Sequence, residues 1–248
     1  YQVSFSAGWA TNPKEIIEAN AGGIYGWWGV DFVWSPNGQK LAYARPDGIG
    51  TVDIATGEFE PLLEITELST FSDWAWIPGI TWGGDSRTLY TVTHAPSSSL
   101  VSLEESPYFD LSAVPISNAT SIEMALQTGM FAYPSSSPIR PSGKEYMYQI
   151  AYLQAIFPSQ SESSRYRVIV MDRDGSNRHE VFPPEDAQGI NPQTPIWAPE
   201  PISGQEGDFL AVVYQGNLWL VDSASGQSHQ ITGDGLISRI DWQSLEEK

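Results

Sequence analysis

From about residue 30 onward, short apolar runs alternate with clusters of turn residues. In the stretch 30–63, VDFVWSPNGQKLAYARPDGIGTVDIATGEFEPLL, the large residues Leu41 and Tyr43 alternate with the small residues Ala42 and Ala44. This two-residue period is typical of a strand rather than a helix. The runs are separated by SPNG, PDG and TG, whose Pro, Asn, Asp and Gly residues favour tight turns. The stretch therefore predicts four antiparallel strands, at 30–34, 41–44, 52–54 and 59–63.

Three later stretches repeat this pattern imperfectly. The first strand of the unit ends at Trp34, and we call this position the anchor of the repeat. We assign the equivalent anchors to Trp82, Ile139, Trp197 and Trp242, roughly 45 to 58 residues apart. The third strand also recurs, each time followed by an Asp-containing turn, in TVDIATG (51–57), VIVMDRDG (168–175) and LWLVDSASG (218–226). Four-stranded units at this spacing cannot bury both faces alone, and they pack radially into a β-propeller.

The repeats predict an all-β chain that forms one domain over residues 1–248, a five-bladed β-propeller of four-stranded antiparallel blades. The closing blade is expected to combine a C-terminal strand at Ile237–Trp242 with N-terminal strands that include Tyr1–Phe5. Residues 12–22 also satisfy helix-capping rules, but we favour an outer strand there because ring closure needs one. The blades are expected at about 30–65, 77–125, 133–183, 193–232, and 236–248 together with 1–28.

Three segments carry a family resemblance: WSPNGQKLAYA (34–44), MDRDGSN (171–177) and NLWLVDSASGQSHQIT (217–232). They resemble the repeats of TolB-type β-propellers, the WD-like repeat family of bacterial exported proteins. The resemblance covers most of residues 30–242, and the five repeats counted here depart from the six blades of TolB itself. It implies an extracytoplasmic protein, periplasmic, cell-surface or secreted. Propellers of this type occur as scaffold and binding domains, and also as lids on serine peptidases.

Composition narrows the range of partners. The 248 residues include 30 acids and 12 bases, which gives a formal net charge of -18. Such a surface repels phosphate backbones and anionic headgroups, so we expect no nucleic-acid partner. No apolar run approaches the roughly 20 residues that span a bilayer, so we expect no membrane insertion. We expect a monomer, and because the chain begins at Tyr1 without a signal-like segment, a mature product or an excised domain.

The chain lacks the common catalytic motifs. It contains no G-x-S-x-G, P-loop, H-E-x-x-H or dinucleotide-binding glycine pattern, and no cysteine. Its histidines, His94, His179 and His229, fall in different repeats. The segment DRDGSN (172–177) departs from the calcium loop of an EF-hand, because its glycine comes fourth rather than sixth. We expect a hairpin turn there and no cofactor or metal, with calcium as the alternative because the surface is acidic.

Paired carboxylates at the channel were considered as a catalytic site. A glycosidase needs two carboxyl groups facing one cleft, roughly 5 to 9.5 Å apart. The positions three residues before the repeat anchors are Asp31, Gly79, Ser136, Thr194 and Arg239. Only one of these is an acid, so we assign no catalytic residues. A glycoside hydrolase-like or peptidase-associated propeller is the alternative, with Asp73 and Asp85 as nearby acids. We also expect Asp31 to pair with Arg239 across the seam of the ring, with Asp241 nearby.

Aromatic residues gather in the segments that lead into the predicted inner strands. In a propeller these segments emerge on one face around the axis, and exposed aromatic residues there often mark interaction sites. The aromatic set is Tyr25, Trp27, Trp28, Phe71, Trp74, Trp76, Phe131 and Tyr133. Together with Asp31, Asp73 and Asn191, it is expected to line a cup for a protein or glycan ligand. The alternative is that these side chains pack beneath the loops. We therefore expect a non-catalytic binding or scaffold propeller.

Overall fold

The computed structural model describes most of the chain, and its regular structure is almost entirely β. The described residues are 2–6, 9–14, 30–71, 73–96, 101–142, 145–202 and 207–243. Two short 3-10 helices, η2 (Leu103–Glu105) and η3 (Pro158–Gln160), interrupt the strands. No helix within these ranges is long and apolar enough to cross a membrane.

Sixteen of the strands form four antiparallel four-stranded sheets, an arrangement typical of a β-propeller. The first sheet contains β3 (Asp31–Trp34), β4 (Lys40–Arg45), β5 (Gly48–Asp53) and β6 (Phe59–Glu64). The second contains β7 (Ile80–Trp82), β8 (Thr88–His94), β9 (Phe109–Pro115) and β10 (Ile122–Ala125). The third contains β11 (Ser135–Ser136), β14 (Gln149–Ala155), β15 (Tyr166–Asp172) and β16 (His179–Phe182). The fourth contains β17 (Ile196–Trp197), β18 (Phe209–Tyr214), β19 (Asn217–Asp222) and β20 (Ser228–Gln230).

One register recurs in all four sheets, and it corrects the third repeat anchor. Trp34 pairs with Leu41, Trp82 with Leu89, Trp197 with Leu210, and Ser136 with Ile150. The anchor of the third sheet is therefore Ser136 and not Ile139, as the sequence alignment had it. Ile139 lies beyond the first strand, just before a hairpin, β12 (Arg140–Ser142) with β13 (Glu145–Met147), that is inserted between the first and second strands of this sheet.

The predicted Asp turns close the outer hairpins. The Asp53 carboxylate accepts hydrogen bonds from the backbone N–H groups of Thr56 and Ala55, at 3.0 and 2.9 Å. These bonds, with that of Thr56 first, lower the pKa of Asp53. In the fourth sheet Asp222 accepts equivalent bonds from Ala224 and Ser225. An aspartate at the end of the third strand therefore fixes the turn to the fourth strand by satisfying its backbone donors.

Tryptophan side chains join neighbouring sheets. The indole N–H of Trp82 donates to the backbone oxygen of Val33 at 2.9 Å, and that of Trp197 donates to the backbone oxygen of Ser135 at 3.1 Å. In both cases the acceptor lies one residue before the anchor of the preceding sheet. The turns after β3 and β7 also meet, because the N–H of Asn37 donates to the Ser86 hydroxyl at 3.1 Å. The inner strands β3 and β7 therefore run in the same direction.

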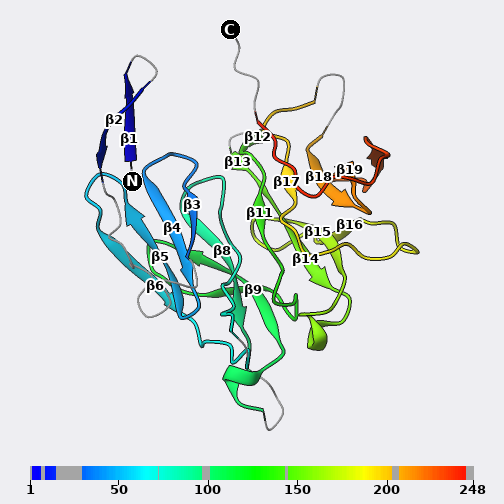
Figure 1. Ribbon diagram of the computed structural model, residues 1–248, viewed down its shortest axis with the longest axis horizontal. Helices are drawn as coiled ribbons and strands as arrows, with labels where there is room; N and C mark the ends of the chain where they lie inside the picture. The colour runs from blue at the N-terminus through cyan, green and yellow to red at the C-terminus, as the bar shows by residue number, and fades with distance from the viewer. Residues whose placement is uncertain are drawn as a thin grey trace.

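The four sheets succeed one another around a common axis, with their first strands innermost (Figure 1). A cavity of about 530 Å³ is lined by residues of β3, β7, β11 and β17. Apolar layers fill the spaces between neighbouring sheets: Ala42 and Leu89 belong to one layer, and Val170 and Leu210 to another. The inner strands thus surround an axial cavity, while the core is divided among the sheet interfaces.

The fifth blade is not confirmed. In the first hairpin β1 (Gln2–Ser6) pairs with β2 (Trp9–Lys14), and these two strands form a sheet of their own. The structure has no strand over residues 231–243, so the predicted strand at Ile237–Trp242 is not confirmed. Figure 1 shows β1 and β2 beside the first sheet and the last described residues beside the fourth. Residues 15–22 of the ambiguous segment lie outside the described residues.

We expect Trp82→Phe to lower the free energy of unfolding by about 1 kcal/mol, because the partly buried carbonyl of Val33 loses its donor. Trp74→Phe is the control, since Trp74 is only half-buried and its indole makes no hydrogen bond to a described residue. Urea unfolding of both variants measures the difference. Equal losses in the two variants would show that the indole–carbonyl bond contributes nothing particular to stability.

Candidate functional site

The segments that connect successive sheets all cross the same end of the third strand. In each sheet, a backbone N–H of the segment leaving the sheet donates to a carbonyl at the start of that sheet's third strand. The bonds are Ile65 to Asp47 (3.0 Å), Thr128 to Phe109 (2.8 Å), Ile190 to Tyr166 (2.9 Å) and Ile237 to Gly216 (2.8 Å). The segments therefore enter the inner strands on one face of the molecule, which we call the entry face.

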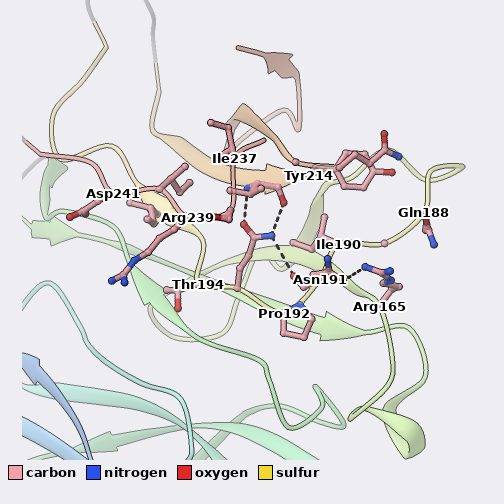
Figure 2. A pocket seen from close by; sticks show the side chains of 18 residues that line it. Arg165, Gln188, Ile190, Asn191, Pro192, Thr194, Tyr214, Ile237, Arg239 and Asp241 are labelled. Atoms are coloured by element: carbon pink, nitrogen blue, oxygen red, sulfur yellow. Dashed lines mark hydrogen bonds between the residues drawn. The ribbon is translucent and has the colours of Figure 1, made fainter. Parts of the chain in front are cut away.

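A groove of about 700 Å³ lies on the entry face beside the fourth sheet (Figure 2). One wall is the segment 188–194 that leads into β17, and the other is the segment 237–241. Val213–Gly216, at the β18–β19 turn, and the side chain of Arg165 complete the lining. We call this site the entry-face groove.

A glutamine side chain takes the place of backbone at the base of this groove. The Gln193 amide accepts from the N–H of Val213 and donates to the oxygen of the same residue, both at 2.7 Å. In the second sheet the equivalent N–H, that of Val92, donates to the backbone oxygen of Gly79. The side chain of Gln193 thus substitutes for a strand backbone, and both of its polar atoms are held in one orientation.

Further hydrogen-bonding groups line the rest of the groove. The Arg165 guanidinium donates to the Asn191 amide oxygen, and both side chains are exposed (Figure 2). Tyr214 is held by edge contacts with Phe182, whose ring centre lies 5.4 Å away, and with Trp219. The groove therefore presents guanidinium, amide and phenol groups whose side chains are held in place by their neighbours, which suits recognition by hydrogen bonding.

The C-terminal wall contributes opposite charges. Arg239 and Asp241 are exposed on the segment 237–241, and the guanidinium of Arg239 points away from Arg165 in Figure 2. The ion pairs among described residues do not include one between Asp31 and Arg239, so the predicted seam pair is not formed. The segment that carries Arg239 lies against the fourth sheet instead.

At the axis, the corrected register brings Asp31 and Tyr133 into equivalent positions, three residues before their anchors. Burial raises the pKa of Tyr133 above its ordinary value of 10.0, and the charge of Asp31 raises it further. Tyr133 also packs on Gly79, where an added Cβ would lie 3.1 Å from its ring. The charge of Asp31 thus acts on the phenol of Tyr133 at the entry end of the channel.

The aromatic residues of the predicted cup are divided. Tyr25, Trp27 and Trp28 lie outside the described residues. Trp76 is in the core, and its indole N–H donates to the backbone oxygen of Met130 at 3.0 Å. Trp74 packs against the same core cluster, while Phe71 is 85% exposed.

The remaining predicted site residues lie on the entry face. Tyr133 stacks on Phe131 with ring centres 5.8 Å apart. Asp73 is exposed on the segment before β7, and Asn191 belongs to the groove. The structure thus joins Asp31 with Tyr133 and places Asn191 beside residues that the sequence analysis did not select.

Those missed residues are Arg165, Gln193 and Tyr214. Arg165 ends the Ser-rich stretch QAIFPSQSESSR (154–165), which carries no recognisable motif, and Gln193 directly precedes an aligned position, Thr194. A search for polar residues next to each aligned position would have found Gln193. Nothing in the sequence pairs Arg165 with Asn191, because their proximity depends on packing between connections.

Asp31 and Asp85, two of the carboxylates of the hydrolase alternative, lie at opposite ends of the inner strands. Asp31 begins β3 at the entry end, whereas Asp85 lies in the β7–β8 turn at the other end of the parallel inner strands. Asp85 instead accepts a hydrogen bond from the hydroxyl of Tyr148 at 3.3 Å. Asp31 and Asp85 therefore cannot act as the carboxyl pair of a glycosidase.

The DRDGSN turn is closed by its own side chains. Asp174 accepts hydrogen bonds from the Ser176 hydroxyl at 2.6 Å and from its N–H at 3.0 Å, and the hydroxyl bond is the main cause of the lowered pKa of Asp174. Asp172 accepts from the side chain of Asn177. Within the described ranges no three acidic or histidine side chains gather as a metal site.

No protein-family model matches the chain, and no curated protein sequence matches it. Among solved structures, it is similar to oligogalacturonate lyase from Vibrio parahaemolyticus at 12% identity and a TM-score of 0.48, over 80% of this chain and 51% of the lyase. It is also similar to dipeptidyl peptidase 4 from Porphyromonas gingivalis, with 12% identity and a TM-score of 0.44, over 82% and 32% of the two chains.

A structure assigned to TolB from Agrobacterium tumefaciens is a further likeness, with 12% identity and a TM-score of 0.29, over 82% of this chain and 80% of that one. The chain spans about half the length of the lyase and about a third of the peptidase. Likenesses at this level give no information on activity, and TolB-type membership in particular is not shown.

We expect Asp31→Asn to bring the pKa of Tyr133 back toward 10.0, because the substitution removes a negative charge that disfavours the phenolate. Since the folded-state pKa is raised, the neutral phenol stabilises the fold below pH 10 and this contribution is lost as the pH rises through the raised pKa. The variant therefore loses less stability there. Carbon NMR of the tyrosine rings against pH measures the shift. Asp73→Asn is the control, and an equal effect of both changes would contradict the proximity of Asp31 and Tyr133.

Proposed function

We propose that this chain is a binding module that recognises a protein or glycan ligand through its entry-face groove. The observation that carries the proposal is the fixed orientation of polar groups there. Gln193 is held by two hydrogen bonds to Val213, and Asn191 is held by Arg165. Hydrogen-bonding groups held rigidly before a ligand arrives lose little conformational entropy on binding, which favours affinity.

The shape of the groove supports an extended ligand. It is open along the surface and bounded by two segments that run in the same general direction, 188–194 and 237–241 (Figure 2). Tyr214 offers an amphipathic ring beside these polar groups, of the kind that contacts both sugars and peptides. Polar groups around one aromatic ring are a common composition for such sites.

The proposal includes the finer features that the sequence predicts. The scaffold is a five-bladed ring of the TolB type, in an exported protein that acts as a monomer outside the cytoplasm. The net charge of -18 supports a partner other than nucleic acid. The exposed Phe71 and the acidic Asp73 extend the contact surface along the same face.

A glycan array and a pull-down from periplasmic and secreted fractions test the proposal. We expect Asn191→Ala and Arg165→Ala each to weaken binding of the ligand found by at least about tenfold, the effect of losing a charge-assisted hydrogen bond at an interface. Arg87→Ala is the matched control, because Arg87 is an equally exposed arginine on the far β7–β8 turn.

Comparison with Arg87→Ala shows whether the groove or the net charge governs binding. If Arg87→Ala weakens binding as much as Arg165→Ala, net charge rather than the groove governs recognition. If the wild-type protein retains no ligand from either screen, the binding proposal is withdrawn. Circular dichroism and urea unfolding of each variant exclude a loss of fold as the cause.

A further inference from the structure

Trp34 lacks the contact that its two counterparts make. Trp34, Trp82 and Trp197 occupy the same register position in their sheets. Trp82 and Trp197 are buried and donate to a carbonyl of the preceding inner strand. The side chain of Trp34 is 55% exposed, and its indole N–H makes no hydrogen bond to a described residue.

Part of the face of the first sheet that carries Trp34 is uncovered, although Tyr43 and Val52 on the same face are buried. Phe32 and Trp34 lie on this face, and so does Phe59, three strands further out on β6; they are 43%, 55% and 37% exposed. The opposite face carries Ala42 and Ala44, which are fully buried against the second sheet. An apolar sheet face of this kind is expected to pack against another element.

The far end of the array of sheets has a matching open face. In the fourth sheet Leu218 and Leu220 are half-buried on the side away from the third sheet, and Ile231 beyond β20 is 53% exposed. The axial cavity lies between the first and fourth sheets, since Trp34 of the first sheet and Trp197 of the fourth both line it. One further inner strand between these two residues would contact both.

The segment that begins at Ile237 leads toward the gap between the first and fourth sheets. The bond from the Ile237 N–H to Gly216 repeats the crossing bond that precedes β7, β11 and β17. The residue whose N–H makes this bond precedes the next anchor by a short, similar distance. Thr128 comes eight residues before Ser136, the anchor of the third sheet, and Ile190 comes seven residues before Trp197, the anchor of the fourth. The residues after Ile237 therefore stand where the next inner strand begins. Ile240 and Trp242 are half-buried, and no strand pairs with them.

We propose that residues 240–243 dock as an inner strand beside β3, where one of their backbone carbonyls accepts a hydrogen bond from the indole N–H of Trp34. This contact gives the first sheet the same inter-sheet bond that Trp82 and Trp197 make. It deepens the proposed five-bladed ring, on which it rests, by naming the residue that closes it. Closure would also fix the C-terminal wall of the entry-face groove.

Hydroxyl-radical footprinting read by mass spectrometry tests this contact, because Trp82 and Trp197 serve as buried internal standards in the same sample. We expect Trp34 of the wild-type protein to be oxidised as slowly as these two. Ile240→Asp places a charge in the docking strand and is expected to raise Trp34 oxidation several-fold. Ser238→Asp, with the same charge at an exposed position, is expected to leave it unchanged.

Each result decides the matter. Rapid oxidation of Trp34 in the wild-type protein overturns the proposal. Slow oxidation that Ile240→Asp does not change overturns it too, because another element then covers Trp34. Constant oxidation of Trp82 and Trp197 shows that the variants are folded. Trp34→Phe gives a second measure: a loss of stability like that of Trp82→Phe is expected if the bond forms, and no loss contradicts it.

The test is separate from that of ligand binding. Arg165→Ala is expected to weaken binding in the groove by at least about tenfold and to leave Trp34 oxidation unchanged. A protein that binds no ligand but protects Trp34 would refute the proposed function and keep the docking contact. A protein that binds a ligand while Trp34 is freely oxidised would do the reverse.

Discussion

A single backbone hydrogen bond, made once in every sheet, organises the entry face. It ties the segment leaving each sheet to the start of that sheet's third strand, from Ile65 in the first to Ile237 in the fourth. Because the bond recurs at one register position, each connection turns toward the axis at the same height. The entry-face groove and the Asp31–Tyr133 pair both lie on the side that this bond defines. An unpaired carbonyl at the same place would cost desolvation free energy, which explains why such different sequences preserve the contact.

Much of the fold can be predicted from local chemistry. The Asp turns at Asp53 and Asp222 are visible in the sequence because an aspartate that binds its own downstream backbone needs no tertiary partner. The strand alternation around Tyr43 is readable for a similar reason: the pleat alone sends neighbouring side chains to opposite faces. Four sheets with the expected strand order follow from these local signals.

The errors arise where distant segments decide the outcome. An apolar pattern favours Ile139 as the third anchor because the true anchor, Ser136, is not apolar, and only the pairing of Ser136 with Ile150 shows this. Trp76 was assigned to a surface cup, yet its indole is satisfied by Met130, more than fifty residues away. Arg165 and Asn191 meet through packing of two connections, a contact that no local pattern encodes.

The amide of Gln193 has a consequence for how this surface could change. Where neighbouring sheets use main-chain atoms, the fourth sheet closes its ladder with a side chain. Main-chain pairing is available to almost any amino acid, whereas this arrangement depends on a single codon. Replacing that residue would free the segment before β17 to move relative to Val213, so related chains could alter the width of their groove in one evolutionary step while every sheet stays intact.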